Sequence, residues 1–160
     1  MRSIIVVALL FVVPVAFSQN FWQQTARLEG GHILCLGVNS SGQLYAGTRS
    51  GLFRSTDNGA NWTQAKTGFP NTDVISIVLN SSGHVFAGTP GSGVYRSTDN
   101  GGSWVPVNTG ITNTWINSLA VNAGGVLFAG TPGGGVFRST DNGGNWIQLT
   151  SGLTNSNVSS

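Results

Sequence analysis

Three aspartates recur along the sequence at a constant spacing, and each stands in the same short motif. Asp57, Asp99 and Asp141 are separated by 42 residues in both steps. Carboxylates can act as metal ligands or as the acid and base of a hydrolase. In a tight turn, an aspartate instead accepts hydrogen bonds from backbone N–H groups that the adjoining strands leave unpaired. Catalytic groups have to converge on one site, whereas these three are dispersed one per repeat, so we interpret them as turn residues.

The motif around each aspartate is Ser-x-Asp-x-Gly-x-x-Trp, and we expect its members to be structural. The Asn-Gly pair inside it favours positive φ, which suits a tight hairpin. The tryptophan offers a large apolar face that can cover that hairpin. The alternating acids that a calcium loop needs are absent. The predicted structural residues are Ser55, Asp57, Gly59, Trp62, Ser97, Asp99, Gly101, Trp104, Ser139, Asp141, Gly143 and Trp146.

The repeat around the motif predicts the fold class. The segments 84–104 and 126–146 are identical at 16 of 21 positions, and a period of 42 is typical of propeller blades. Short β-branched and aromatic runs between Gly, Asn and Pro indicate strands, and no window has a helical period. We therefore predict an all-β, incomplete β-propeller of about three four-stranded antiparallel blades, with the motif as the turn between the third and fourth strands. In the second unit the strands are expected at 74–79, 84–89, 93–97 and 103–108.

The motif, three times in register, resembles the Asp-box (BNR) repeat of a family of β-propellers. That family includes sialidases, xyloglucanases, sortilin-like receptor domains and photosystem II assembly factors. The resemblance covers residues 33–158 and implies the blade fold more strongly than any activity. It also implies that the box is a fold element on the outer edge of the blade, away from the active face.

The sequence lacks the groups that the enzymes of this family use. A sialidase needs three converging arginines and a tyrosine nucleophile beside an acid. Here the arginines recur at one strand position of each unit, and each tyrosine has a phenylalanine as its equivalent elsewhere. Outside the motifs the acids are only Glu29 and Asp73, so a paired-carboxylate glycosidase is hard to build. We predict no catalytic residue, no metal and no cofactor.

Positions that differ between otherwise uniform units mark the candidate ligand face. The residue just before the first strand varies most, and it lies in the loop that joins one blade to the next. Trp115, beside asparagine and threonine, suits stacking on a sugar ring while amides bind the hydroxyls; packing on the neighbouring blade is its alternative role. The candidate residues of this face are His32, Asp73, Trp115, Asn71, Asn113 and Arg49.

The amino-terminal segment predicts export. Arg2 precedes a run of apolar residues, 4–17, and small residues at Ala16 and Ser18 suit cleavage near Ser18/Gln19. The run is too short to span a bilayer, so we expect a signal peptide over 1–18 and a secreted, periplasmic or cell-surface protein. The net charge of +2 without a basic patch argues against nucleic acid. The single cysteine excludes an internal disulfide and a thiolate zinc site.

The repeat also predicts how the chain is divided. A propeller closes with about four to eight blades, so we expect either the rest of a longer chain or self-association to close the ring. One blade would otherwise expose unpaired apolar surface. The expected units are a lone fourth strand and loop over 19–32, blades over 33–73, 74–115 and 116–157, and the start of a truncated further blade over 158–160.

These observations predict a secreted, non-catalytic propeller that serves as a scaffold or binding module for glycan or protein at the cell surface. Two alternatives stay open. The chain is a fragment of an Asp-box glycoside hydrolase of the exo-sialidase or xyloglucanase type, with its catalytic residues elsewhere, or it is an assembly factor of the photosystem II type. In each case we expect no nucleic-acid partner and no membrane association after signal cleavage.

Overall fold

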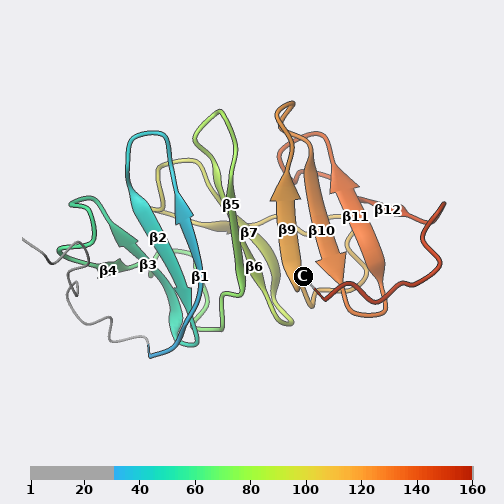
Figure 1. The fold of residues 1–160 in the computed structure, drawn as a ribbon, viewed down its shortest axis with the longest axis horizontal. Helices are drawn as coiled ribbons and strands as arrows, with labels where there is room; N and C mark the ends of the chain where they lie inside the picture. The colour runs from blue at the N-terminus through green and yellow to red at the C-terminus, as the bar shows by residue number, and fades with distance from the viewer. Residues whose placement is uncertain (1–30, 160) are drawn as a thin grey trace, which may run out of the picture.

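The computed structural model describes residues 31–159, which form three four-stranded antiparallel sheets (Figure 1). The predicted signal peptide, and nearly all of the predicted lone strand and loop, lie outside these residues. The sheets follow one another along the chain as an open arc, and residues 31–159 contain no helix. The prediction of an all-β, incomplete propeller of three blades is confirmed.

Each blade is a meander in which every strand pairs with its neighbour in sequence. Blade 1 consists of β1 (Ile33–Val38), β2 (Leu44–Thr48), β3 (Gly51–Ser55) and β4 (Thr63–Gln64). Blade 2 consists of β5 (Ser76–Leu79), β6 (Val85–Thr89), β7 (Gly93–Ser97) and β8 (Val105–Pro106). Blade 3 consists of β9 (Ser118–Val121), β10 (Leu127–Thr131), β11 (Gly135–Ser139) and β12 (Ile147–Leu149).

The first and fourth strands of blade 2 are shorter than the sequence predicts. Strand β5 begins at Ser76 rather than at Val74, because the N–H of Val74 donates to the carbonyl of Thr48 in blade 1 at 3.0 Å. Strand β8 covers two residues, because the N–H of Trp104 donates to the carbonyl of Thr67 at 3.0 Å and Pro106 has no N–H to offer. The N–H groups of Val74 and Trp104 therefore pair with the preceding blade and its connection, whereas those of Ile75 and Val107 still donate within blade 2, to the carbonyls of Gly88 and Val94 at 3.1 and 2.9 Å.

Each repeated motif forms a turn that its serine and aspartate hold together. In blade 2, Oδ1 of Asp99 accepts hydrogen bonds from Ser97 Oγ at 2.7 Å and from the Ser103 N–H at 2.8 Å. Ser97 Oγ accepts from the Gly101 N–H at 2.7 Å. The same bonds recur in the other two blades, and each turn contains an asparagine at positive φ, namely Asn58, Asn100 and Asn142. The side chains thus satisfy N–H groups that a tight turn leaves unpaired.

These hydrogen bonds favour the ionised carboxylates. Donation by the Ser103 hydroxyl and N–H holds the pKa of Asp99 well below its ordinary value. In blade 3, donation by the Asn145 side chain and N–H lowers the pKa of Asp141 from 3.8 to about 2. The negative charge of each aspartate is therefore part of the turn.

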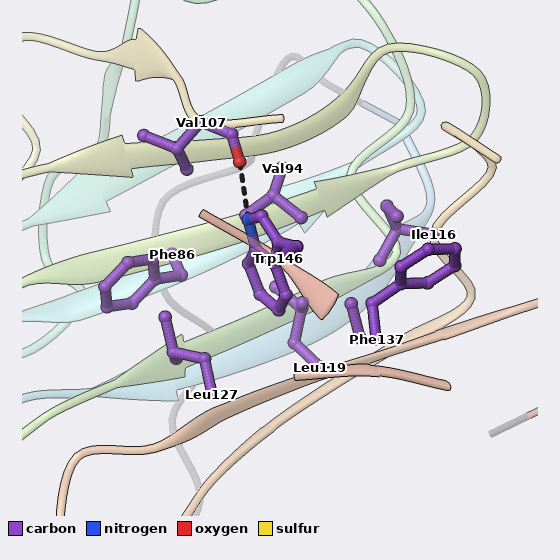
Figure 2. Packing of buried hydrophobic residues seen from close by; sticks show 9 residues of the cluster. Phe86, Val94, Val107, Ile116, Leu119, Leu127, Phe137 and Trp146 are labelled. Atoms are coloured by element: carbon purple, nitrogen blue, oxygen red, sulfur yellow. Dashed lines mark hydrogen bonds between the residues drawn. The ribbon is translucent and has the colours of Figure 1, made fainter. Parts of the chain in front are cut away.

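Successive blades pack face to face around the motif tryptophan. Trp146 of blade 3 is 4% exposed and lies among Phe86, Val94 and Val107 of blade 2 and its connection (Figure 2). Its Nε1–H donates to the carbonyl of Val107 at 2.8 Å. A Cβ added to Gly110, which has φ +91°, would collide with the Trp146 carbonyl, so the connection passes too close for any other residue.

An arginine adds a second bond at each of these joints. Arg54 Nη1 of blade 1 donates to the carbonyl of Asn100 in the blade 2 turn at 2.8 Å. Arg96 Nη1 of blade 2 donates to the carbonyl of Asn142 in the blade 3 turn at 2.9 Å. Arg54 and Arg96 therefore tie the motif turns of blades 2 and 3 to the preceding blade.

We expect Trp146→Ala to lower the free energy of unfolding by about 3–5 kcal/mol, because it leaves a cavity in the joint between blades 2 and 3. Urea denaturation measures this loss. Trp115→Ala is the matched control, since Trp115 is 50% exposed and an exposed substitution changes stability by about 0.5 kcal/mol or less. Equal losses in the two variants would contradict the packing described for Trp146.

We also expect the fold to lose stability in acid. The folded pKa of Asp141 lies below its ordinary 3.8, so its contribution is complete above about pH 3.8 and is lost as the pH falls toward about 2. Thermal unfolding followed by circular dichroism should show a Tm gap between the wild type and Asp141→Asn that narrows from about pH 5 to about pH 2. A gap that stays constant would show that ionisation of this turn does not stabilise the fold.

Candidate functional site

The six residues predicted to form a ligand face lie at one end of the sheets, where His32 directly precedes β1 and the other five lie in connections. These connections join the second strand to the third within a blade, and the fourth strand to the first strand of the next blade. The motif turns lie at the opposite end (Figure 1). We call this end the loop face and define it by residues 31–32, 49–50, 70–75, 90–92, 112–117 and 132–134.

Trp115 lies on the loop face at the joint between blades 2 and 3. Its side chain is 50% exposed, while its backbone pairs with Pro90 in an isolated antiparallel bridge. The neighbouring Thr114 carbonyl accepts from the N–H groups of Gly91 and Gly93 at 3.1 and 2.9 Å. The backbone that carries the indole is therefore fixed, and half of the Trp115 surface is exposed.

Asn113 supports this loop instead of facing solvent. Its Oδ1 accepts from the Trp115 N–H at 3.0 Å, and its Nδ2 donates to the carbonyl of Pro132 in blade 3 at 2.7 Å. The amide is thus engaged at both ends. The geometry gives Asn113 a positioning role beside Trp115, which differs from the ligand contact that the sequence suggests for it.

Asn71 and Asp73 take the corresponding place at the joint between blades 1 and 2. Asn71 is exposed, and its side chain makes no hydrogen bond to any group within residues 31–159. Asp73 is half-buried, and the next residue, Val74, is fixed by its bond to Thr48. Beneath this loop, Phe69 packs its ring 5.1 Å from that of Trp104. The amide of Asn71 and the carboxylate of Asp73 are therefore carried on a packed base.

His32 and Arg49 lie on the loop face of blade 1. Both are exposed, and the Arg49 N–H donates to the His32 carbonyl at 3.3 Å. The structure thus groups the six predicted residues in three pairs, one pair at each step of the arc, rather than in one cluster. An extended ligand that runs along the loop face can contact several pairs, whereas a small compact ligand meets only one.

Sequence reasoning missed the loops that hold Trp115 in place. Pro90 pairs with its backbone, and the Pro132 carbonyl accepts from Asn113. Both prolines occur in a Thr-Pro-Gly sequence that the second and third units share. That shared triplet is the signal that could have identified them.

The carboxylates of the described residues do not converge. Asp57, Asp99 and Asp141 lie in the motif turns, at the end opposite the loop face, so Asp73 is the one acid that residues 31–159 place on that face. Hydrolysis by a carboxylate pair needs two acids flanking one bond. Within the same range, no group of three or more His, Cys, Asp or Glu side chains could hold a metal ion.

Cys35 belongs to the joint between blades 1 and 2 and not to the loop face. Its thiol donates to the carbonyl of Val74 at 3.4 Å, and a Cβ on Gly47 would collide with its sulfur. Burial raises the pKa of the thiol to about 11, which keeps it protonated and unreactive at neutral pH.

A search of the described residues for an apolar helix of membrane-spanning length found none.

Comparison with solved structures shows the same fold in larger proteins. The chain is similar to an ancestral GH74 enzyme, at 20% identity over 82% of this chain and 20% of that one, with a TM-score of 0.68. It is similar to the extracellular domain of a protein described as a hybrid two component system of B. thetaiotaomicron, at 21% identity over 82% and 19% of the two chains, with a TM-score of 0.66.

A third similar structure is YCF48 bound to D1 peptide, at 22% identity over 72% of this chain and 38% of that one, with a TM-score of 0.51. The chain spans about a fifth of the length of the first two proteins. No curated protein matches the sequence. At these identities the structural likenesses establish the fold alone.

The family itself is established by sequence. The family described as the DUF6242 beta propeller domain matches residues 18–159, which is most of the chain. The match covers all three blades that the structure describes. The chain therefore belongs to the DUF6242 beta propeller domain family.

Proposed function

We propose that this chain is part of a secreted, non-catalytic Asp-box propeller that binds a glycan along its loop face. The observation that carries the proposal is Trp115, which is half-exposed on a backbone fixed by Pro90 and Asn113. A half-exposed aromatic side chain on a fixed backbone can stack on a sugar ring at a reduced entropic cost. Asn71 and Asp73, one step along the arc, supply an amide and a carboxylate for sugar hydroxyls.

The distribution of acids supports binding over hydrolysis. Among residues 31–159, one acid lies on the loop face, and the motif aspartates are engaged in their turns. The likeness to a GH74 enzyme favours a second candidate, in which a longer protein is a glycoside hydrolase and these blades contribute binding contacts. The likeness to an extracellular domain, together with the expected signal peptide, supports an extracellular location.

We expect Trp115→Ala to weaken glycan binding at least about tenfold, since it removes the stacking surface. The measurement is binding of the purified chain to an array of plant and animal glycans, followed by titration of the strongest binder. Val105→Ala is the control, because Val105 is 49% exposed on β8 at the outer edge of its blade and away from the loop face. Unchanged binding in Trp115→Ala would refute the role of this residue, and capture of a protein instead of any glycan would refute the ligand class.

A further inference from the structure

The inter-blade joints leave the first blade with an unmatched surface. Ile77 in β5 and Leu119 in β9 are each 9% exposed, and they lie against the preceding blade close to Gly37 and Gly88. Both residues pair with the alanine of the adjacent strand. Leu36 in β1 has the same pairing, with Ala46, yet it is 67% exposed. We name the exposed side chains on this side of β1 the blade 1 free face, which consists of Leu34, Leu36 and Val38.

The last blade has the opposite unmatched surface. Tyr45 in blade 1 and Phe86 in blade 2 are 0% exposed because the next blade covers them, whereas the equivalent Phe128 is partly exposed. Ala120, which pairs with Phe128, is also exposed. We name this surface the blade 3 free face, which consists of Ala120, Phe128 and Arg138.

Arg138 shows which kind of partner the blade 3 free face accepts. Its equivalents, Arg54 and Arg96, donate to the carbonyl of the motif asparagine in the next blade. Arg138 is exposed and donates to no group within residues 31–159. The matching acceptor in blade 1 is the carbonyl of Asn58, which has the same positive φ as Asn100 and Asn142. The two free faces are therefore the two halves of one joint.

We propose that a second copy of this chain docks head to tail, with its blade 1 free face on the blade 3 free face of the first copy. Two such joints combine two sets of three sheets into a ring of six blades, within the range in which propellers close. The contact continues the geometry of the two internal joints, since Leu36 takes the place of Ile77 and Leu119, and Arg138 takes the place of Arg54 and Arg96. The proposal concerns the sheet faces, and the pairing of copies requires no ligand on the loop face.

The segment after blade 3 defines how much of the joint the second copy supplies. The Val158 N–H donates to the Thr131 carbonyl at 3.1 Å, as Ile116 does to Thr89 at 3.0 Å. Val158 therefore already covers Gly130, the residue equivalent to Gly88. The second copy supplies Leu36 and Val38, further along β1.

Native mass spectrometry and light scattering of the purified chain over a range of concentrations test the proposal. The expected particle has two copies. Leu36→Asp and Ala120→Asp should each give single copies, because each places a carboxylate in the joint from one of its two sides. Arg138→Ala should raise the dissociation constant at least about tenfold. Val105 is an exposed apolar residue on the outer edge of blade 2. Val105→Asp should therefore form the same two-copy particle as the wild type.

Three outcomes would overturn the proposal. One is a single copy at every concentration. Another is pairing that Leu36→Asp abolishes and Ala120→Asp leaves intact, which indicates two identical faces in contact. The last is an open head-to-tail assembly of more than two copies that both variants disrupt. This result would agree with the joint but would contradict closure into a ring of six blades. Circular dichroism melts confirm that each variant is folded, and a lysine at the same position replaces an aspartate that prevents folding.

Discussion

The joint between neighbouring blades is the interaction on which the rest of this structure depends. A four-stranded blade with two-residue outer strands such as β4 and β8 cannot bury enough apolar surface alone, so stability comes from stacking. At the joint between blades 2 and 3, Trp146 fills the space against Val94 and Val107, and its indole N–H is satisfied by a carbonyl of the preceding blade. The serine and aspartate of the motif fix the turn that carries this tryptophan. One eight-residue motif thus builds both a local turn and a long-range contact.

The sequence predicts best those features that depend on residues close together in the chain. The 42-residue period, the motif turn and the two central strands of each blade depend on residues close together in the chain, and the structure has them where the repeat indicates. The ends of the outer strands depend on distant groups, and in blade 2 the first and fourth strands are shorter than predicted. The Trp104 N–H pairs with Thr67, which precedes it by a whole blade, and no pattern within residues 103–108 signals this bond. Tertiary hydrogen bonds therefore set the length of the outer strands.

The same distinction applies to the candidate site. Differences between the repeats were sufficient to place Trp115, Asp73 and their neighbours in loops at one end of the sheets, because loop position follows from strand order. They were not sufficient to separate binding residues from positioning residues. Asn113 and Asn71 are equivalent in the repeat, yet only Asn113 reaches a carbonyl of the next blade, that of Pro132. The same Thr-Pro-Gly loop follows both asparagines, so the repeat alone does not show which amide is engaged.

The loop face and the joints are physically coupled, because the same backbone bonds hold both. Val74 and Ile116 donate to the carbonyls of the preceding blade and also follow directly on Asp73 and Trp115. The spacing between candidate binding residues is therefore set by the stacking distance of the blades. The equivalent of Asn113 after blade 3 is Asn155, whose Oδ1 accepts from the Asn157 N–H at 2.8 Å. In the proposed pair of copies, Asn155 would face the 49–50 loop of the second copy. Each joint between copies would therefore extend the loop face from one copy to the next.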